Sequence, residues 1–177
     1  MNMMLVMSLR EIEGRKASPS AGVIDSHSVK ITESGGVCGY DADQKIKGRK
    51  RHILTDTCGV LIFIVVHAAD VQDRDGAVDV LKGIRQRYPW PRHVFADGSY
   101  PGPKLRNEMG RHGSWAIEII KRSDTAKGFE ILPRRWVVER TFAWLGRCRC
   151  LAKTGKPQSP PHAHPTHRKI LLRLRNF

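Results

Sequence analysis

The order in which strand-like and helix-like segments follow one another constrains the fold of this chain more than any other feature. Three strand-like segments come first, at residues 23–31, at 45–56 and in the apolar run VLIFIVVHAA at 60–69. Alternating or continuously apolar stretches bounded by turn residues are typical of strands. Cys58-Gly59 marks a tight turn, so we expect an antiparallel meander whose apolar run is covered on both faces.

Helices and strands alternate after this meander. A helix with one apolar face is expected at 75–88, a strand at 93–96 and a polar helix around 104–111. A strand over 115–120 and a strong helix that starts at Pro133 complete the pattern. The order βββ-α-β-α-β-α predicts an α/β, ribonuclease H-like fold with a mixed five-stranded sheet and flanking helices.

Composition narrows the class of protein. The 177 residues include 31 Lys and Arg against 17 Asp and Glu, which gives a net charge of +14 and a pI near 10.2. Such a charge favours polyanions, most commonly nucleic acid, although ribosomal and membrane-surface proteins are basic too. The longest apolar run is too short to span a bilayer, and the N-terminus lacks the features of a signal peptide. The four cysteines form no CxxC pair, so we expect free thiols in a cytoplasmic protein.

Three carboxylates lie at points where the predicted elements can bring them together. Asp25 lies on the first strand, Asp97 ends the fourth, and Glu139 lies in the last helix, four residues after Arg135. The first and fourth strands are neighbours in this fold, and three converging oxygen ligands suit Mg²⁺. Two such ions would serve phosphodiester chemistry. Taken singly, the three residues have simpler explanations: a solvent-facing strand residue, a turn former and a partner of Arg135.

Six stretches together cover about residues 5–153, and they are long and specific. They are VIDSHSVK, GYDADQKIKGRKRHILTDTCG, HAADVQDRDGA, RHVFADGSY, IIKRSDTAKGF and LPRRWVVERTFAWLGRCR. They resemble the catalytic domain of a bacterial insertion-sequence transposase, from the IS5-like branch of the IS4 DDE class. The resemblance implies a catalytic DDE triad of Asp25, Asp97 and Glu139 that holds two Mg²⁺, with Mn²⁺ as a substitute. It also implies phosphodiester hydrolysis at transposon ends, followed by strand transfer.

Double-stranded DNA is the partner that the resemblance implies, both as terminal inverted repeats and as target. Homo-oligomerisation is left open, and no membrane association is expected. The class carries Tyr, Arg and Lys at fixed offsets on the Glu helix; Arg135 matches, whereas Leu132 and Gly146 replace the other two. Phosphate contact from this helix then rests on Arg135, helped by Arg140 and Arg147. A basic cluster is expected to grip the DNA backbone, with a solvated edge as the alternative; it comprises Lys45, Lys47, Arg49, Lys50 and Arg51.

Three further aspartates precede the first long helix, and capping of that helix explains them more simply than a role as alternative ligands; they are Asp70, Asp73 and Asp75. Both ends of the chain differ from the family pattern. Residues 1–22 are interpreted as a remnant helix with a linker, 23–153 as the catalytic domain, and 154–177 as an atypical basic tail, with a frameshift as the first explanation and a natural tail that wraps DNA as the alternative. A downstream reading frame that restores an apolar helix would support the frameshift.

These features predict a truncated, inactive transposase copy, associated with the nucleoid in a bacterial cytoplasm. Two alternatives stay open. One is a metal-dependent nuclease of the same fold that cuts without joining. The other is a DNA-binding remnant without catalysis, whose binding would be insensitive to loss of Asp97.

Overall fold

The computed structural model describes residues 2–31, 36–112, 116–120 and 133–148. Its helices are α1 (Asn2–Ile12), α2 (Asp73–Arg87), α3 (Pro103–His112) and α4 (Pro133–Arg147). Its strands are β1 (Ala21–Lys30), β2 (Gly39–Asp41), β3 (Ile46–Asp56), β4 (Leu61–Ala68), β5 (His93–Ala96) and β6 (Ala116–Ile119). Every strand and helix predicted from the sequence is present, although the tail over 154–177 lies outside the described residues.

The strands form one mixed sheet in the order β2-β3-β1-β5-β6, with β4 also paired to β3. The β1–β3 and β3–β4 pairs are antiparallel, which confirms the meander, while β1–β5 and β5–β6 are parallel. The predicted number of five strands was wrong, because the sheet has six. The additional strand, β2, lies in a polar, Gly-rich stretch and is defined by pairing with the start of β3, which no periodicity could reveal.

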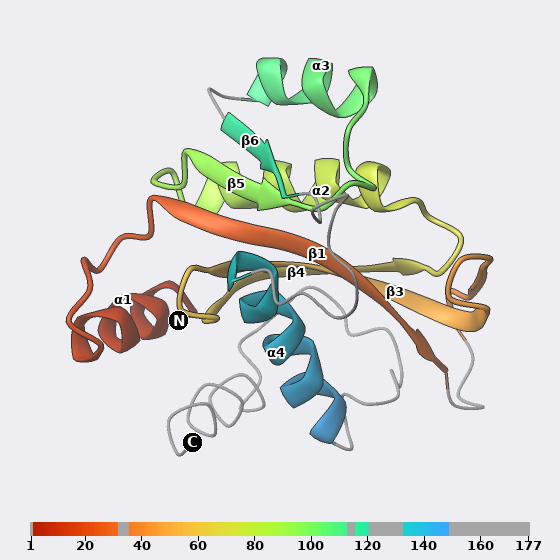
Figure 1. The fold of residues 1–177 in the computed structure, drawn as a ribbon, viewed down its shortest axis with the longest axis horizontal. Coiled ribbons are helices and arrows are strands. Elements are labelled where there is room, and N and C mark those ends of the chain that lie inside the picture. The colour runs from red at the N-terminus through yellow and green to blue at the C-terminus, as the bar shows by residue number, and fades with distance from the viewer. Residues whose placement is uncertain (1, 32–35, 113–115, 121–132, 149–177) are drawn as a thin grey trace, which may run out of the picture.

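Two apolar cores lie on opposite faces of the sheet, one under α2 and one under α4 (Figure 1). Ile24 and Leu54 belong to the core that α2 covers. Val23 and Ile53 belong to the other core, together with Val138 of α4. Because successive side chains of a strand point to opposite faces, the odd-numbered residues of β1 face α4 and the even-numbered ones face α2.

The turn between β3 and β4 ties α1 to the sheet. Gly59 adopts a positive φ of 90°, and the Asp56 side chain accepts hydrogen bonds from the backbone N–H groups of Cys58 (2.9 Å) and Val60 (2.8 Å). This is the tight turn that the sequence predicts. The other oxygen of Asp56 forms a buried ion pair with Arg10 of α1. The α1 helix is therefore anchored to the sheet by a buried charge pair.

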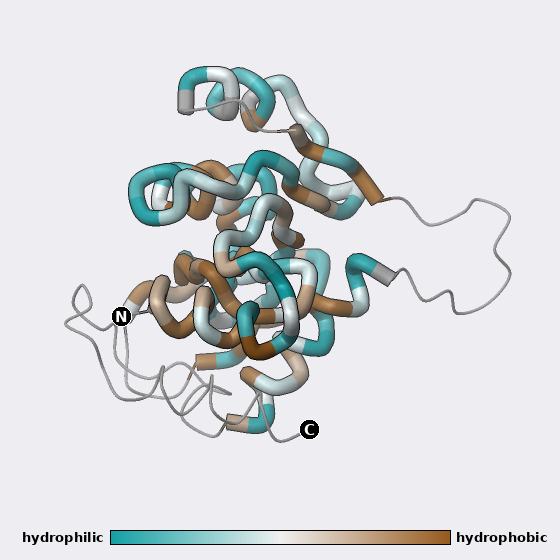
Figure 2. Tube along the Cα trace, turned by 90° about the vertical axis from the view of Figure 1, so that its left-hand side faces the viewer, coloured by the Kyte–Doolittle hydropathy of each residue, from teal (hydrophilic) through white to brown (hydrophobic). Residues whose placement is uncertain are grey.

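The strand β6 lies at the edge of the sheet, beside β5. In Figure 2 this strand, which ends at the long grey segment, has one hydrophilic position between apolar ones, and exposed and half-buried residues alternate along it. The predicted strand began at Trp115, which lies outside the described residues. None of the helices that the structure describes combines the length and apolar character needed to cross a bilayer.

Candidate active site

The pairing of β1 with β5 places Asp25 beside Asp97. Ala21 pairs with His93 and Val23 with Phe95, an offset of 72 residues. The same offset, carried two residues further, sets Asp25 opposite Asp97, one residue beyond the end of β5. The fourth strand predicted from the sequence, at 93–96, is β5 in the structure. The prediction that it lies beside the first strand is thus confirmed. On β1, Asp25 has odd parity and therefore faces α4.

Arg135 connects the third carboxylate to this point. Its Nη2 atom lies 3.7 Å from an oxygen of Asp97 and 3.7 Å from an oxygen of Glu139. One partly buried guanidinium thus attracts both carboxylates, each at slightly more than hydrogen-bond length. The predicted pairing of Arg135 with Glu139 across one helical turn is present. The glutamate is therefore joined to the aspartates by a charge rather than by direct contact.

Asp25 lies in an environment that opposes its negative charge. Burial is the main cause that raises the pKa of this carboxyl from 3.8 to about 7, and the charges of Asp97 and Asp73 raise it further. The backbone N–H of Ser26 and the charge of Arg135 act in the opposite direction. A carboxyl with this combination of burial and negative neighbours is stabilised by any cation that enters the site.

Asp97 is both a turn former and a member of this carboxylate group. Its side chain accepts hydrogen bonds from the backbone N–H of Ser99, at 2.9 Å, and from the hydroxyl of Ser99. Tyr100 is fully buried beneath the turn. Its pKa lies well above 10, because of burial and then the charges of Asp25, Asp73 and Asp97. Forming the turn and lying in the group of carboxylates are therefore compatible properties of the Asp97 side chain.

The donor set fits a hard divalent cation, but its oxygens do not converge on one point. Within the described ranges, no three Asp, Glu, His or Cys side chains lie close enough together to hold a metal ion as they stand. The carboxylates nevertheless supply the oxygen ligands that Mg²⁺ prefers. Burial, and to a smaller extent the charges of Asp97 and Asp73, raise the pKa of Asp25, and a bound cation would offset both effects. We conclude that the residues suit a metal in chemistry and charge.

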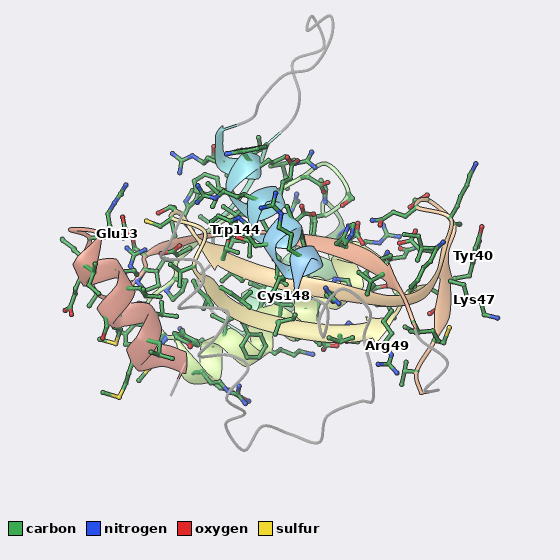
Figure 3. All side chains as sticks on the ribbon, turned by 90° about the horizontal axis from the view of Figure 1, so that it is seen from below. Glu13, Tyr40, Lys47, Arg49, Trp144 and Cys148 are labelled. Atoms are coloured by element: carbon green, nitrogen blue, oxygen red, sulfur yellow. The ribbon has the colours of Figure 1, made fainter. Side chains whose placement is uncertain are left out.

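The basic cluster predicted for DNA contact divides into exposed and buried residues. Lys45 and Lys47 are exposed, and Figure 3 shows Lys47 beside Tyr40 at the outer end of the sheet. Arg49, Lys50 and Arg51 are only 4%, 6% and 3% exposed. All three lie on a stretch of β3 that pairs with β1 on one side and with β4 on the other. Charges this deep do not form an exposed surface for a DNA backbone.

The buried cations and Arg140 have partners within the fold or lie deep inside it. Arg49 donates a hydrogen bond to the carbonyl of Val37 at 2.8 Å, and burial lowers the pKa of Arg51. Arg140 donates to the carbonyl of Cys58 at 2.8 Å, and its guanidinium stacks over a Trp ring of the same helix. Arg140 therefore clamps α4 to the β3–β4 turn. Leu132, one of the two positions at which the chain departs from the pattern that the resemblance implies, lies outside the described residues.

Sequence reasoning missed the role of Asp73. Gln72 is the N-cap residue of α2 and makes no side-chain capping bond, while Asp73 is the first helical residue. The carboxylate of Asp73 instead contacts Ser26, Lys50 and Ser99. These partners lie 47, 23 and 26 residues away in the chain, so no local sequence signal identifies them.

Comparison with known proteins finds a matching family of transposases and a related transposase. The family model described as "Transposase DDE domain" matches residues 16–157. The putative transposase for insertion sequence element IS402 of Burkholderia cepacia is 34% identical over 120 residues, which cover 62% of this chain and 54% of that protein. The chain thus spans about half the length of this curated relative.

A solved structure supports the fold. A chain from the cryo-EM structure of the simian T-cell lymphotropic virus intasome in complex with PP2A regulatory subunit B56 gamma aligns with a TM-score of 0.56. The sequence identity is 13%, and the alignment covers 90% of this chain and 50% of that one. Together with the strand order, this likeness confirms the ribonuclease H-like fold. The IS5-like branch of the IS4 class stays a prediction.

Proposed function

We propose, for a chain that belongs to the transposase DDE domain family, a function as the metal-dependent catalytic domain of an insertion-sequence transposase. The reaction is hydrolysis of a phosphodiester at a transposon end, followed by attack of the freed 3′-OH on target DNA. The observation that carries the proposal is the β1–β5 register, which sets Asp25 beside Asp97 while Arg135 links Asp97 to Glu139.

Asp25, Asp97 and Glu139 are the proposed ligands of two Mg²⁺, with Mn²⁺ as a substitute. When bound, these ions supply an activated nucleophile and stabilise the leaving oxygen. The partly buried position of Asp25 limits solvent screening, which strengthens its attraction for a cation. Arg135 holds Asp97 and Glu139 near each other, and its fork of N–H donors suits a DNA phosphate as well.

Double-stranded DNA, as transposon ends and as target, is the proposed partner, and the bacterial nucleoid in the cytoplasm is the proposed location. The exposed Lys45 and Lys47 are the proposed backbone contacts, since the other three residues of the basic cluster are buried. Replacing both lysines by Ala should reduce the slope of log affinity against log salt concentration by about 0.9 per lost phosphate contact. Lys16→Ala, an exposed change near α1, should leave the slope as it is. An unchanged slope in the double variant would remove these lysines from the interface.

Nicking of a supercoiled plasmid in Mg²⁺ or Mn²⁺ tests the catalytic proposal. The chain should nick, and Asp97→Ala should not, because a ligand of the ions is lost. Asp43→Ala, which removes an exposed carboxylate in the β2–β3 turn, is the matched control and should nick like the parent. If the parent binds DNA but never nicks, the chain is a DNA-binding remnant.

Product analysis separates a transposase from a nuclease of the same fold. The substrate is a pre-cut DNA end taken from the flank of the gene that encodes this chain, mixed with a supercoiled target plasmid. A transposase yields covalently joined ends, whereas a nuclease yields cut products alone. Absence of joined products despite nicking would contradict strand transfer and leave phosphodiester hydrolysis in place.

A further inference from the structure

Asp73 is surrounded by side chains from three different parts of the sheet. One of its oxygens accepts hydrogen bonds from the hydroxyl of Ser26 at 2.7 Å and from the ammonium group of Lys50 at 3.1 Å. The other accepts a hydrogen bond from the hydroxyl of Ser99 at 3.2 Å. The start of α2 is thereby joined to β1, to β3 and to the turn after β5.

Two of these partners also bind the aspartates of the proposed site. The backbone N–H of Ser26 donates to Asp25 at 2.8 Å. The backbone N–H of Ser99 donates to Asp97 at 2.9 Å, and its hydroxyl contacts Asp97 as well. A serine hydroxyl carries a single proton, so that of Ser99 is shared between Asp97 and Asp73. Each of the two aspartates is therefore linked through one serine to the same partly buried carboxylate, that of Asp73.

Asp73 is itself held in place. Lys50 is 6% exposed and lies 3.1 Å from an oxygen of Asp41 as well as 3.1 Å from Asp73. Asp41 in turn accepts hydrogen bonds from the hydroxyl of Ser28 and from two backbone N–H groups of the β2–β3 turn. These bonds lower the pKa of Asp41 to about 2, although burial opposes them. The Lys50 charge compensates Asp73 and fixes it on the α2 face of the sheet.

We propose that Asp73 is a positioning residue, which holds Asp25 and Asp97 in place for metal binding through Ser26 and Ser99. This inference rests on the proposed function. The oxygens of Asp73 accept hydrogen bonds from Ser26, Ser99 and Lys50. Its influence on Asp25 and Asp97 is therefore indirect and passes through the two serines. Groups that orient metal ligands in this way contribute about 10- to 100-fold to metal affinity.

Mn²⁺ binding by the full chain without DNA, followed by electron paramagnetic resonance of free Mn²⁺, tests the inference. Asp73→Asn and Ser99→Ala should each weaken the affinity for Mn²⁺ by about tenfold or more. The variant that carries both changes should bind Mn²⁺ about as well as the single variant with the lower affinity, since both changes break the connection between Asp73 and Ser99. Asp79→Asn is the matched control on α2, because this side chain is 55% exposed and pairs with His67.

The outcomes separate this inference from the proposed function. If the parent binds no Mn²⁺, the proposed function fails and the inference fails with it. If the parent binds Mn²⁺ and Asp73→Asn binds it equally well, Asp73 only supports the fold and the inference alone is overturned. Circular dichroism melting shows whether Asp73→Asn folds. If it does not, Ser26→Ala decides, because this change removes the hydroxyl that binds Asp73 and keeps the backbone N–H that donates to Asp25: a tenfold loss supports the inference, and parental affinity overturns it.

Discussion

Asp25 should make the stability of the metal-free protein depend on pH. Its pKa rises from 3.8 in the unfolded chain to about 7 in the folded one, a difference of roughly 3 pH units. At about 1.4 kcal/mol per unit, ionised Asp25 costs the folded state about 4 kcal/mol. The folded carboxyl retains its proton to higher pH than the unfolded one. This cost is therefore absent below pH 4, grows as the pH rises and is complete above pH 7.

Asp25→Asn removes this cost, because an amide stays neutral. In EDTA, the variant and the parent should have similar free energies of unfolding at pH 4. At pH 8 the variant should be more stable by up to about 4 kcal/mol. Urea denaturation at pH 4, 6 and 8 measures the difference, and the contributions of the titrating groups that do not interact with Asp25 cancel between the two proteins.

A control variant and a measurement with added Mn²⁺ complete the experiment. Asp43→Asn changes an exposed carboxylate, so its stability should follow the parent at every pH. Addition of Mn²⁺ at pH 8 should stabilise the parent and not Asp25→Asn, because ligand binding to the folded state adds to stability. A stability difference between Asp25→Asn and the parent that is the same at pH 4 and pH 8 would refute the reasoning from burial and charge.

Two further predictions concern the fold that holds the site. Asp56→Asn leaves Arg10 as an unpaired buried charge and should lower the free energy of unfolding by about 3–5 kcal/mol in urea titrations. Gly76→Ala should destabilise the protein by about 1–3 kcal/mol, since a Cβ there would lie 2.2 Å from the buried ring of His52. Gly110→Ala is its control, because a Cβ in α3 meets nothing within 4 Å; it should be neutral or stabilising by up to about 1 kcal/mol. An equal response of the two glycine variants would contradict the packing explanation.

The sequence predicts the strands and their neighbours well, because the relevant signals are local. Alternation along β1 and β6, the apolar run of β4 and the Cys58-Gly59 turn each follow from a few adjacent residues. The short strand β2 escapes detection, since three residues show no period and exist as a strand through pairing with β3. The strand β2 can be identified only when its pairing with β3 is known.

The side-chain predictions fail where the environment comes from distant elements. Five cations within seven residues suggest an exposed surface, either for DNA or for solvent, yet Arg49, Lys50 and Arg51 are buried on a strand that is paired on both sides. Asp73 resembles a capping residue in its local sequence, and its partners come from β1, β3 and the turn after β5. In both cases the residues that surround the side chain in space are far from it in the sequence, so the local sequence predicts the wrong environment.

The pair Asp25-Ser26 shows how strand register specifies this site. Adjacent strand residues point to opposite faces, so the carboxylate of Asp25 faces α4 while the hydroxyl of Ser26 reaches Asp73 on the α2 side. A slip of one residue in β1 would turn Asp25 away from Asp97 and carry Ser26 off Asp73 at the same time. The 72-residue offset between β1 and β5 and the alternation along β1 must therefore be satisfied together. It follows that a carboxylate placed at residue 24 or 26 could not replace Asp25, even though each lies within one residue of it.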